Sequence, residues 1–204
     1  MTSLANFLVS FIFSFIGTVP PGTLNLNILQ LGLDNKIATA WRFALAAALV
    51  EYPYAWLAVK FEGVIVATPG VAENIQLIAA CVMSALGVFT LWSLRYPSQF
   101  ATRFNESGFR RGLLLAILNP LALPFWVGAT AYLNSQHWIL IDTPLRLHAY
   151  LLGVSCGALV LLMMIAYLAR LVLLLVKKNE RLFKIIPGVV LLVLGVYGFV
   201  QYFS

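Results

Sequence analysis

Apolar residues gather in six long runs that short polar loops separate. The runs cover about residues 4–31, 40–59, 73–94, 110–131, 147–176 and 184–202. A helix rises 1.5 Å per residue, so about 20 apolar residues cross the hydrocarbon core of a bilayer. The runs lack the period-two alternation of a membrane barrel. We therefore predict an all-α, polytopic membrane protein with six transmembrane helices, of which the first and fifth tilt, bend or extend past the bilayer.

Composition supports a membrane protein. Hydrophobic residues make up 62% of the chain and charged residues 10%, whereas soluble domains average about 45–50% and 25%. We expect one transmembrane domain over residues 1–204. The first run has no basic residue ahead of it and no signal-peptide cleavage pattern, so we expect it to remain in the protein as a helix.

Basic residues are distributed unevenly among the loops. Only Lys60 and Arg146 lie in the loops after the second and fourth runs. The other eleven follow the first, third and fifth runs: Lys36, Arg42, Arg95, Arg103, Arg110, Arg111, Arg170, Lys177, Lys178, Arg181 and Lys184. The positive-inside rule places these loops in the cytoplasm and both termini outside. Orientation therefore accounts for the net charge of +6, and we expect no nucleic-acid partner.

Two of the six runs are interrupted at corresponding points. The first run contains GTVPPGTLNLN at residues 17–27, with a break at Pro20-Pro21-Gly22, and the fourth contains Asn119-Pro120. Because each half would hold three spans, the halves would cross the membrane in opposite directions. We predict two inverted three-helix repeats, at about 1–95 and 110–204, joined by a cytoplasmic loop of about 95–110. The first helix of each repeat is broken at proline.

A broken helix is costly in lipid and useful beside a cavity. Proline removes a backbone hydrogen bond, and the freed groups need partners in protein or water. A half-helix N-terminus presents N–H groups to an anion, and a half-helix C-terminus presents carbonyls to a cation. An amino acid zwitterion needs both. We therefore place a small-molecule pathway at Pro21, Gly22, Asn119 and Pro120.

Polar residues continue beyond the first break. Thr23, Asn27, Gln30 and Asp34 form one stripe at helical spacing, and Thr23 is a candidate cap for the new half-helix. Asn25 points to a different face. We interpret Thr23, Asn25, Asn27 and Gln30 as candidate pathway residues. The alternative is that the asparagines only bond carbonyls that the prolines free.

Glu51 is the only carboxylate well inside a predicted span. A charge at bilayer depth costs about 2.5–3.5 kcal/mol on insertion scales. Its helix face otherwise carries small residues, which allow close helix packing: Ala40, Ala44, Ala47, Ala55 and Ala58. We therefore expect Glu51 to face the bundle and to bind a proton or a substrate ammonium. The alternative is a protonated acid that only bonds a neighbouring helix.

Trp126 shares a face of the fourth run with Asn119 and Thr130. It is a candidate wall of the pocket, although a core aromatic fits equally well. Other small residues recur at spacings that favour helix packing rather than substrate binding: Gly153 and Gly157; Ala80, Ser84 and Gly87; Gly188, Gly195 and Gly198. Three tryptophans near predicted span ends, Trp41, Trp92 and Trp138, are expected to anchor the interfaces.

Motifs of metal, cofactor and enzyme sites are missing from the sequence. Cys81 and Cys156 lie in apolar runs without metal-binding or CxxC spacing. The chain has no glycine-rich phosphate loop, no Ser/His/Asp arrangement and no HExxH motif. We expect no enzyme activity, no metal site and no cofactor.

The layout resembles the LysE/RhtB amino-acid exporters. The matching motifs are Pro21-Gly22 in the first helix and Asn119-Pro120 at the start of the second half; Thr23 and Leu121 stand where the family usually carries Pro and Lys. The resemblance implies a secondary transporter in the bacterial inner membrane, exporting amino acids or related small metabolites against proton flow. Two alternatives stay open: a cation exporter of the same superfamily, and a membrane scaffold without transport. A homo-oligomer is also open.

Overall fold

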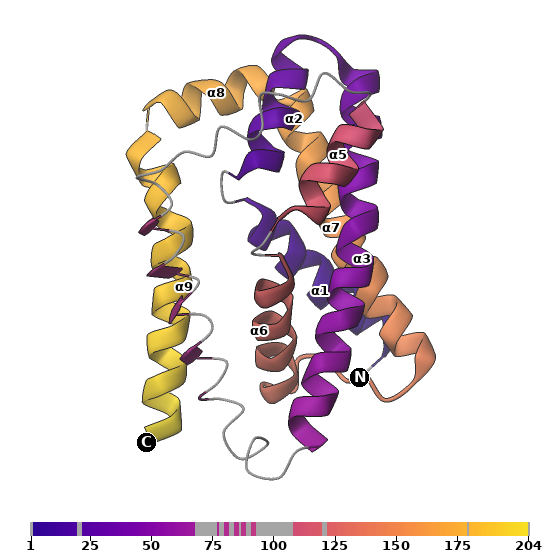
Figure 1. The fold of residues 1–204 in the computed structure, drawn as a ribbon, viewed down its shortest axis with the longest axis vertical. Helices are drawn as coiled ribbons and strands as arrows, with labels where there is room; N and C mark the ends of the chain where they lie inside the picture. The colour runs from indigo at the N-terminus through magenta and orange to yellow at the C-terminus, as the bar shows by residue number, and fades with distance from the viewer. Residues whose placement is uncertain are drawn as a thin grey trace.

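The computed structural model is built from helices (Figure 1). It describes residues 2–19, 22–67, 77, 80–81, 84–85, 87–88, 91–92, 108–119, 122–178 and 180–203. The helices are α1 (Ser3–Thr18), α2 (Thr23–Leu33), α3 (Ile37–Ala67), α5 (Gly108–Ile117), α6 (Ala122–Ser135), α7 (Pro144–Tyr167), α8 (Ala169–Lys178) and α9 (Glu180–Phe203). Within these ranges the remaining residues form turns and short loops, which confirms the prediction of an all-α chain.

Three segments of the described chain are long and apolar enough to cross a membrane. One is the continuous helix α7. The other two are bent pairs, α1 with α2 at 79° and α5 with α6 at 65°. The first and fourth runs are thus broken, as predicted. The count of six spans stays a prediction. The predicted second span lies in α3, which is described throughout and is not among these three segments, and most of residues 73–94 lie outside the described residues.

One predicted boundary was wrong. The second run was expected to end at residue 59, but α3 continues through Pro53 to Ala67, since Lys60 and Glu62 do not interrupt helical geometry. The fifth run was expected to tilt, bend or extend past the bilayer. It is interrupted: α7 ends at Tyr167, with Leu168 in a turn, and α8 crosses one end of the molecule toward α9 (Figure 1).

Close packing of small residues joins α1 to α7. A Cβ on Gly153 would collide with the Ser10 hydroxyl, and one on Gly157 would lie 2.8 Å from the Ser14 Cβ. Ser10 and Ser14 are fully buried, one helical turn apart. The predicted packing role of Gly153 and Gly157 is confirmed.

The glycines of α9 pack in the same way against described residues of the third run. A Cβ on Gly87 would lie 2.9 Å from the Gly188 carbonyl, and one on Gly195 would lie 2.8 Å from the Ser84 backbone nitrogen. A Cβ on Gly198 would lie 3.0 Å from that of Ala80. These contacts confirm packing rather than substrate binding as the role of both sets.

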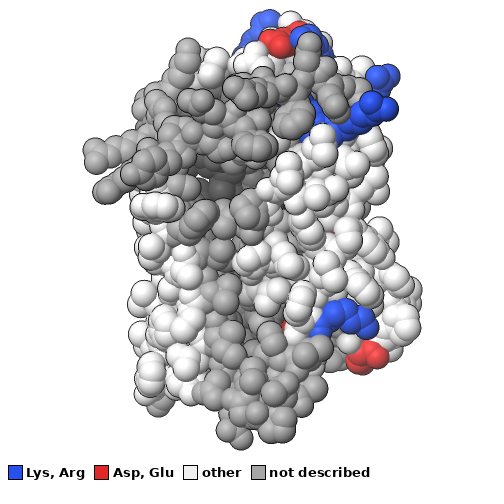
Figure 2. All heavy atoms as spheres, in the orientation of Figure 1, with Lys and Arg blue, Asp and Glu red and all other residues white. Residues whose placement is uncertain are grey.

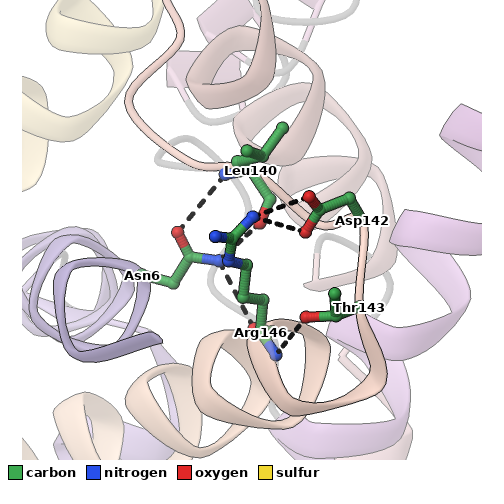
Figure 3. A network of polar contacts seen from close by, with 5 residues as sticks. All are labelled: Asn6, Leu140, Asp142, Thr143 and Arg146. Carbon is green, nitrogen blue, oxygen red and sulfur yellow. Dashed lines mark hydrogen bonds and ion pairs between the residues drawn. The ribbon is translucent and has the colours of Figure 1, made fainter. Parts of the chain in front are cut away.

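A polar network fixes the start of α1 to the start of α7 (Figure 3). The Asn6 amide donates to the Leu140 carbonyl at 2.9 Å and the Arg146 carbonyl at 3.4 Å, and it accepts from the Leu140 N–H at 3.3 Å. Arg146 Nη1 contacts both oxygens of Asp142 at 2.6 and 2.7 Å. Thr143 caps α7 through the Arg146 N–H. The loop ahead of α7 is therefore held against α1.

Apolar side chains form two clusters along the bundle. One joins α2, α3, α5 and α7 around Ile28, Phe43 and Leu162. The other joins α3, α6 and α7 around Trp126 and Leu133. All five alanines of the predicted α3 packing face are buried, so that face does turn into the bundle.

Charged side chains lie toward the two ends of the molecule, and the described surface between them is uncharged in Figure 2. The tryptophans expected at interfaces are all partly exposed, at 45% for Trp41, 57% for Trp92 and 47% for Trp138. Figure 1 marks both chain ends in the lower half, whereas α8 and the turn between α2 and α3 lie at the top.

Candidate functional site

The first break separates α1 from α2 between Thr18 and Thr23. Pro20 and Pro21 fall outside the described residues. The buried Asn25 side chain donates to the carbonyl of Thr18 at 2.5 Å and to that of Val19 at 3.4 Å. An uninterrupted helix would satisfy these carbonyls with backbone N–H groups. The bonds agree with the packing alternative for Asn25.

Thr23 does not cap the second half-helix, so that prediction was wrong. The N-cap is Gly22, in extended conformation and without a side-chain bond. Helix α2 starts one residue earlier than expected, because the Gly22 carbonyl already accepts from the Leu26 N–H at 3.0 Å. A side-chain cap must come from the residue before the helix, and glycine has none.

The predicted polar stripe on α2 is divided into a buried and an exposed part. Asn27 is buried, and its amide donates to the Thr23 carbonyl one turn earlier at 2.7 Å. Gln30 is exposed and donates to Asp34 at 2.8 Å, and Asp34 pairs with Lys36 at 3.4 Å. Gln30 and Asp34 thus belong to the charged end of α2 rather than to one continuous buried face with Asn27.

The second break separates α5 from α6, and a carbonyl beside it accepts a hydrogen bond from a third helix, α3. Helix α5 ends at Ile117, whose carbonyl accepts from the Tyr54 hydroxyl of α3 at 2.8 Å. The Asn119 N–H donates to the Ala116 carbonyl at 3.1 Å. Pro120, which was predicted to make this break, lies outside the described residues.

The flanks of the two breaks touch. A Cβ on Gly17, near the end of α1, would lie 2.6 Å from the Phe125 ring, near the start of α6. Phe125 also meets Trp126 edge to face, with ring centroids 5.1 Å apart. The end of α1 and the start of α6, about a hundred residues apart in sequence, therefore approach each other beside the two breaks.

Glu51 and Trp126 form a direct pair. The Trp126 Nε1–H donates to Glu51 Oε2 at 2.5 Å, and the Trp126 side chain is 2% exposed. The indole can only donate a hydrogen bond and an ionised carboxylate only accepts, so each supplies what the other lacks. Two residues that the sequence singled out in separate spans are thus brought together between α3 and α6.

Two further polar pairs follow on the same face of α6. Thr130 and the Tyr150 hydroxyl of α7 lie 2.8 Å apart, both fully buried. The Asn134 amide donates to Glu62 Oε1 of α3 at 2.6 Å. Trp126, Thr130 and Asn134 are spaced by four residues, so they stand one above another along α6.

Glu62 is a buried carboxylate that the sequence analysis did not single out. It is 7% exposed and lies on α3 beyond the predicted end of the second run. A spacing of eleven residues is close to three helical turns, so Glu62 shares the face of Glu51. The spacing could be read from the sequence, but the second run was predicted to end at residue 59, so Glu62 was not considered as a residue of the same helix face.

Both glutamates lack a basic partner within the described residues. The ion pairs found there are Lys36 with Asp34 and Arg146 with Asp142, both with exposed members. No group of three His, Cys, Asp or Glu that could hold a metal ion occurs in the same part of the chain.

Comparison with known proteins places these features in a family. A sequence model described as LysE type translocator matches residues 15–201. The chain is 26% identical over 115 residues to "Putative amino acid efflux protein YcgF" of Bacillus subtilis (strain 168). That similarity covers 54% of this chain and 55% of the relative, so it spans about half of the relative's length. No solved structure matches the chain. Because this match covers nearly the whole chain, the chain belongs to the LysE type translocator family.

Proposed function

We propose that the protein is a secondary active exporter of amino acids or related small metabolites in the bacterial inner membrane, coupled to protons. The observation that carries the proposal is the Glu51–Trp126 hydrogen bond: within the described residues this carboxylate has no basic partner, and it lies in a bundle that also holds two broken helices. Membership of a translocator family supports it. The name of the Bacillus subtilis relative, "Putative amino acid efflux protein YcgF", supports the substrate class.

The pathway in this proposal runs past the two breaks. Gly22 leaves the N-terminus of α2 without a side-chain cap, so its N–H groups are available to a substrate carboxylate. Asn119 and Pro120 stand at the corresponding point of the second half. Glu51 binds either the substrate ammonium or the coupling proton. The buried faces of Asn27 and Trp126 complete the polar lining.

The proposed topology has six spans in two inverted repeats, with both termini outside. The charge distribution of the loops supports this orientation. A single cysteine placed at residue 103 or 178 should be protected from an impermeant reagent in intact cells and should react after permeabilisation. Rapid labelling of either position in intact cells would show that the protein has the opposite orientation.

Counterflow in proteoliposomes tests the function directly. Vesicles preloaded with one unlabelled amino acid should accumulate the same labelled amino acid, and an imposed pH gradient should drive net transport. A panel of neutral, acidic and basic amino acids identifies the substrate. Flux of metal cations without amino acids would favour cation export, and no flux of either from well-folded protein would favour a scaffold.

A further inference from the structure

A buried carboxylate lies further along α3, the helix that carries Glu51. Glu62 is 7% exposed and accepts from the Asn134 amide at 2.6 Å. It follows Glu51 by eleven residues on one face of α3, about 16 Å along the helix axis. That separation is too long for direct proton transfer between the two carboxylates.

A buried hydroxyl pair belongs to the same set of contacts. Thr130 Oγ1 and the Tyr150 hydroxyl lie 2.8 Å apart, and either can be the donor. A hydroxyl both donates and accepts, so it can take up one proton while releasing another. On α6, Thr130 follows the partner of Glu51 by one turn and precedes the partner of Glu62 by one turn.

The charged and titratable groups around Glu62 can be named within the described residues. Asn134 faces it from α6, and Tyr150 of α7 lies within electrostatic range. On α3 itself, Lys60 is exposed and lies over the Trp56 ring, 5.7 Å from its centroid. Because no basic side chain in this part of the chain pairs with Glu62, burial of the ionised form is uncompensated and favours uptake of a proton.

We propose that Glu62 is a second protonation site of the transport cycle, linked to Glu51 by the Thr130–Tyr150 hydroxyl pair. The inference rests on the proposed function and assigns the coupling route on one side of Glu51. A proton taken up by Glu62 passes to the hydroxyl pair, which releases one of its own protons toward Glu51. Only O–H bonds form and break. The two carboxylates are about 16 Å apart along α3, so the route requires water on both sides of the hydroxyl pair.

The test uses the full chain in proteoliposomes that contain a pH-sensitive dye. Glu62→Gln keeps the size and the Asn134 contact but cannot carry a proton. It should lower substrate-linked proton movement on the order of a hundredfold, the low end for loss of a positioned proton-transfer group. Amino-acid exchange at equal pH on both sides should continue at the parent rate. Asp142→Asn is the matched control, because this carboxylate is exposed and paired with Arg146, and it should change neither reading.

Other results would overturn the inference. Proton movement at the parent level in folded Glu62→Gln would make Glu62 a packing residue. Loss of exchange together with proton movement would make it a substrate contact. If Glu62→Gln does not fold, Tyr150→Phe tests the route instead. Its control is Tyr52→Phe, which removes a hydroxyl outside the route that bonds His148. Loss of proton movement in Tyr150→Phe alone supports the route, and parent behaviour refutes it. If the parent transports amino acids and Glu62→Gln moves protons at the parent level, this inference alone is refuted. If the parent moves no amino acid, the proposed function is refuted and the inference with it.

Discussion

At the break between α1 and α2, the freed carbonyls accept hydrogen bonds from Asn25 of the same helix pair. At the break between α5 and α6, the carbonyl accepts from Tyr54 of a separate helix, α3. Both bonds satisfy carbonyls at the end of an interrupted helix. The donors differ in where they are anchored. Asn25 sits seven residues beyond the carbonyl of Thr18, and Tyr54 comes from a helix 63 residues away from Ile117 in sequence.

This difference separates a locally closed break from one that is tied to the candidate site. Tyr54 follows Glu51 by three residues, so the two stand about one turn apart on α3. A shift of α3 when Glu51 gains or loses a proton would reach the Ile117 carbonyl through the Tyr54 hydroxyl. The described carbonyls at the first break, those of Thr18 and Val19, instead accept from Asn25 of α2. We therefore expect proton coupling to act on the second break.

The largest expected effect comes from Glu51→Gln. The variant keeps nearly the same volume and an acceptor for Trp126, but it removes the titrating group. Net export driven by a pH gradient should fall on the order of a hundredfold or more, while the protein folds. Exchange of amino acid for amino acid separates the roles: it survives if Glu51 carries the proton and falls as well if Glu51 holds the substrate ammonium. Asp34→Asn, at the exposed end of α2, is the control. Unaltered pH-driven export in Glu51→Gln contradicts a coupling role.

Much of the fold around the two breaks was predictable from the sequence, because long apolar runs and prolines determine helix formation within their own segment. The two broken helices, the alanine face of α3 and the glycine contacts of α7 and α9 all follow from spacing on one helix. The prediction of two candidate residues, Glu51 and Trp126, rested on polarity and position within their spans. Their contact, at 2.5 Å, joins residues 75 positions apart, and no periodicity reports a pairing of that kind.

The parts that were missed depend on where a helix ends and on what a side chain meets. Glu62 was overlooked because polar residues were taken to end the second run, although a helix can carry a buried carboxylate when another helix supplies a donor. Thr23 was expected to cap α2, but the start of a helix is uncertain by one residue from sequence alone. Asn25 and Tyr54 could not be assigned to the breaks, since their bonds depend on the bend itself.

Asn25→Ala should be the most damaging change to stability at the breaks. It removes the donor to two carbonyls inside the bundle, and leaving buried acceptors unsatisfied costs about 1–3 kcal/mol. Thermal unfolding in detergent should shift to clearly lower temperature. Asn27→Ala is the matched control, because its amide bonds a carbonyl within a continuous helix, and it should shift unfolding less. Equal shifts for both variants would show that Asn25 does not close the break.

Trp126→Phe isolates the donor to Glu51. The substitution keeps an aromatic ring in the same buried position but removes the indole N–H. Loss of about 1.5 kcal/mol, the low end for a hydrogen bond to a charged group, corresponds to a roughly tenfold lower rate of proton-coupled export. Trp138→Phe, at a half-exposed position, should leave the rate unchanged. A Trp126→Phe variant as active as the parent would assign the indole to core packing, the alternative that the sequence left open.

Tyr54→Phe is the mildest change and the sharpest test of the difference between the breaks. It removes the hydroxyl that donates to Ile117 and leaves the ring packed. A hydrogen bond between membrane helices contributes about 0.6 kcal/mol on average and up to about 1.7, so unfolding should shift only slightly. If the hydroxyl transmits the state of Glu51 to the second break, net export should slow in the parent background, but the same change should have no further effect in Glu51→Gln. Tyr52 lies two residues before Tyr54, on the opposite side of α3, and bonds His148, so Tyr52→Phe should behave alike in both backgrounds. Measuring all six proteins in the same vesicles gives the coupling between residues 51 and 54 as a double-mutant cycle. Additive effects of Glu51→Gln and Tyr54→Phe would mean that the second break is closed as passively as the first.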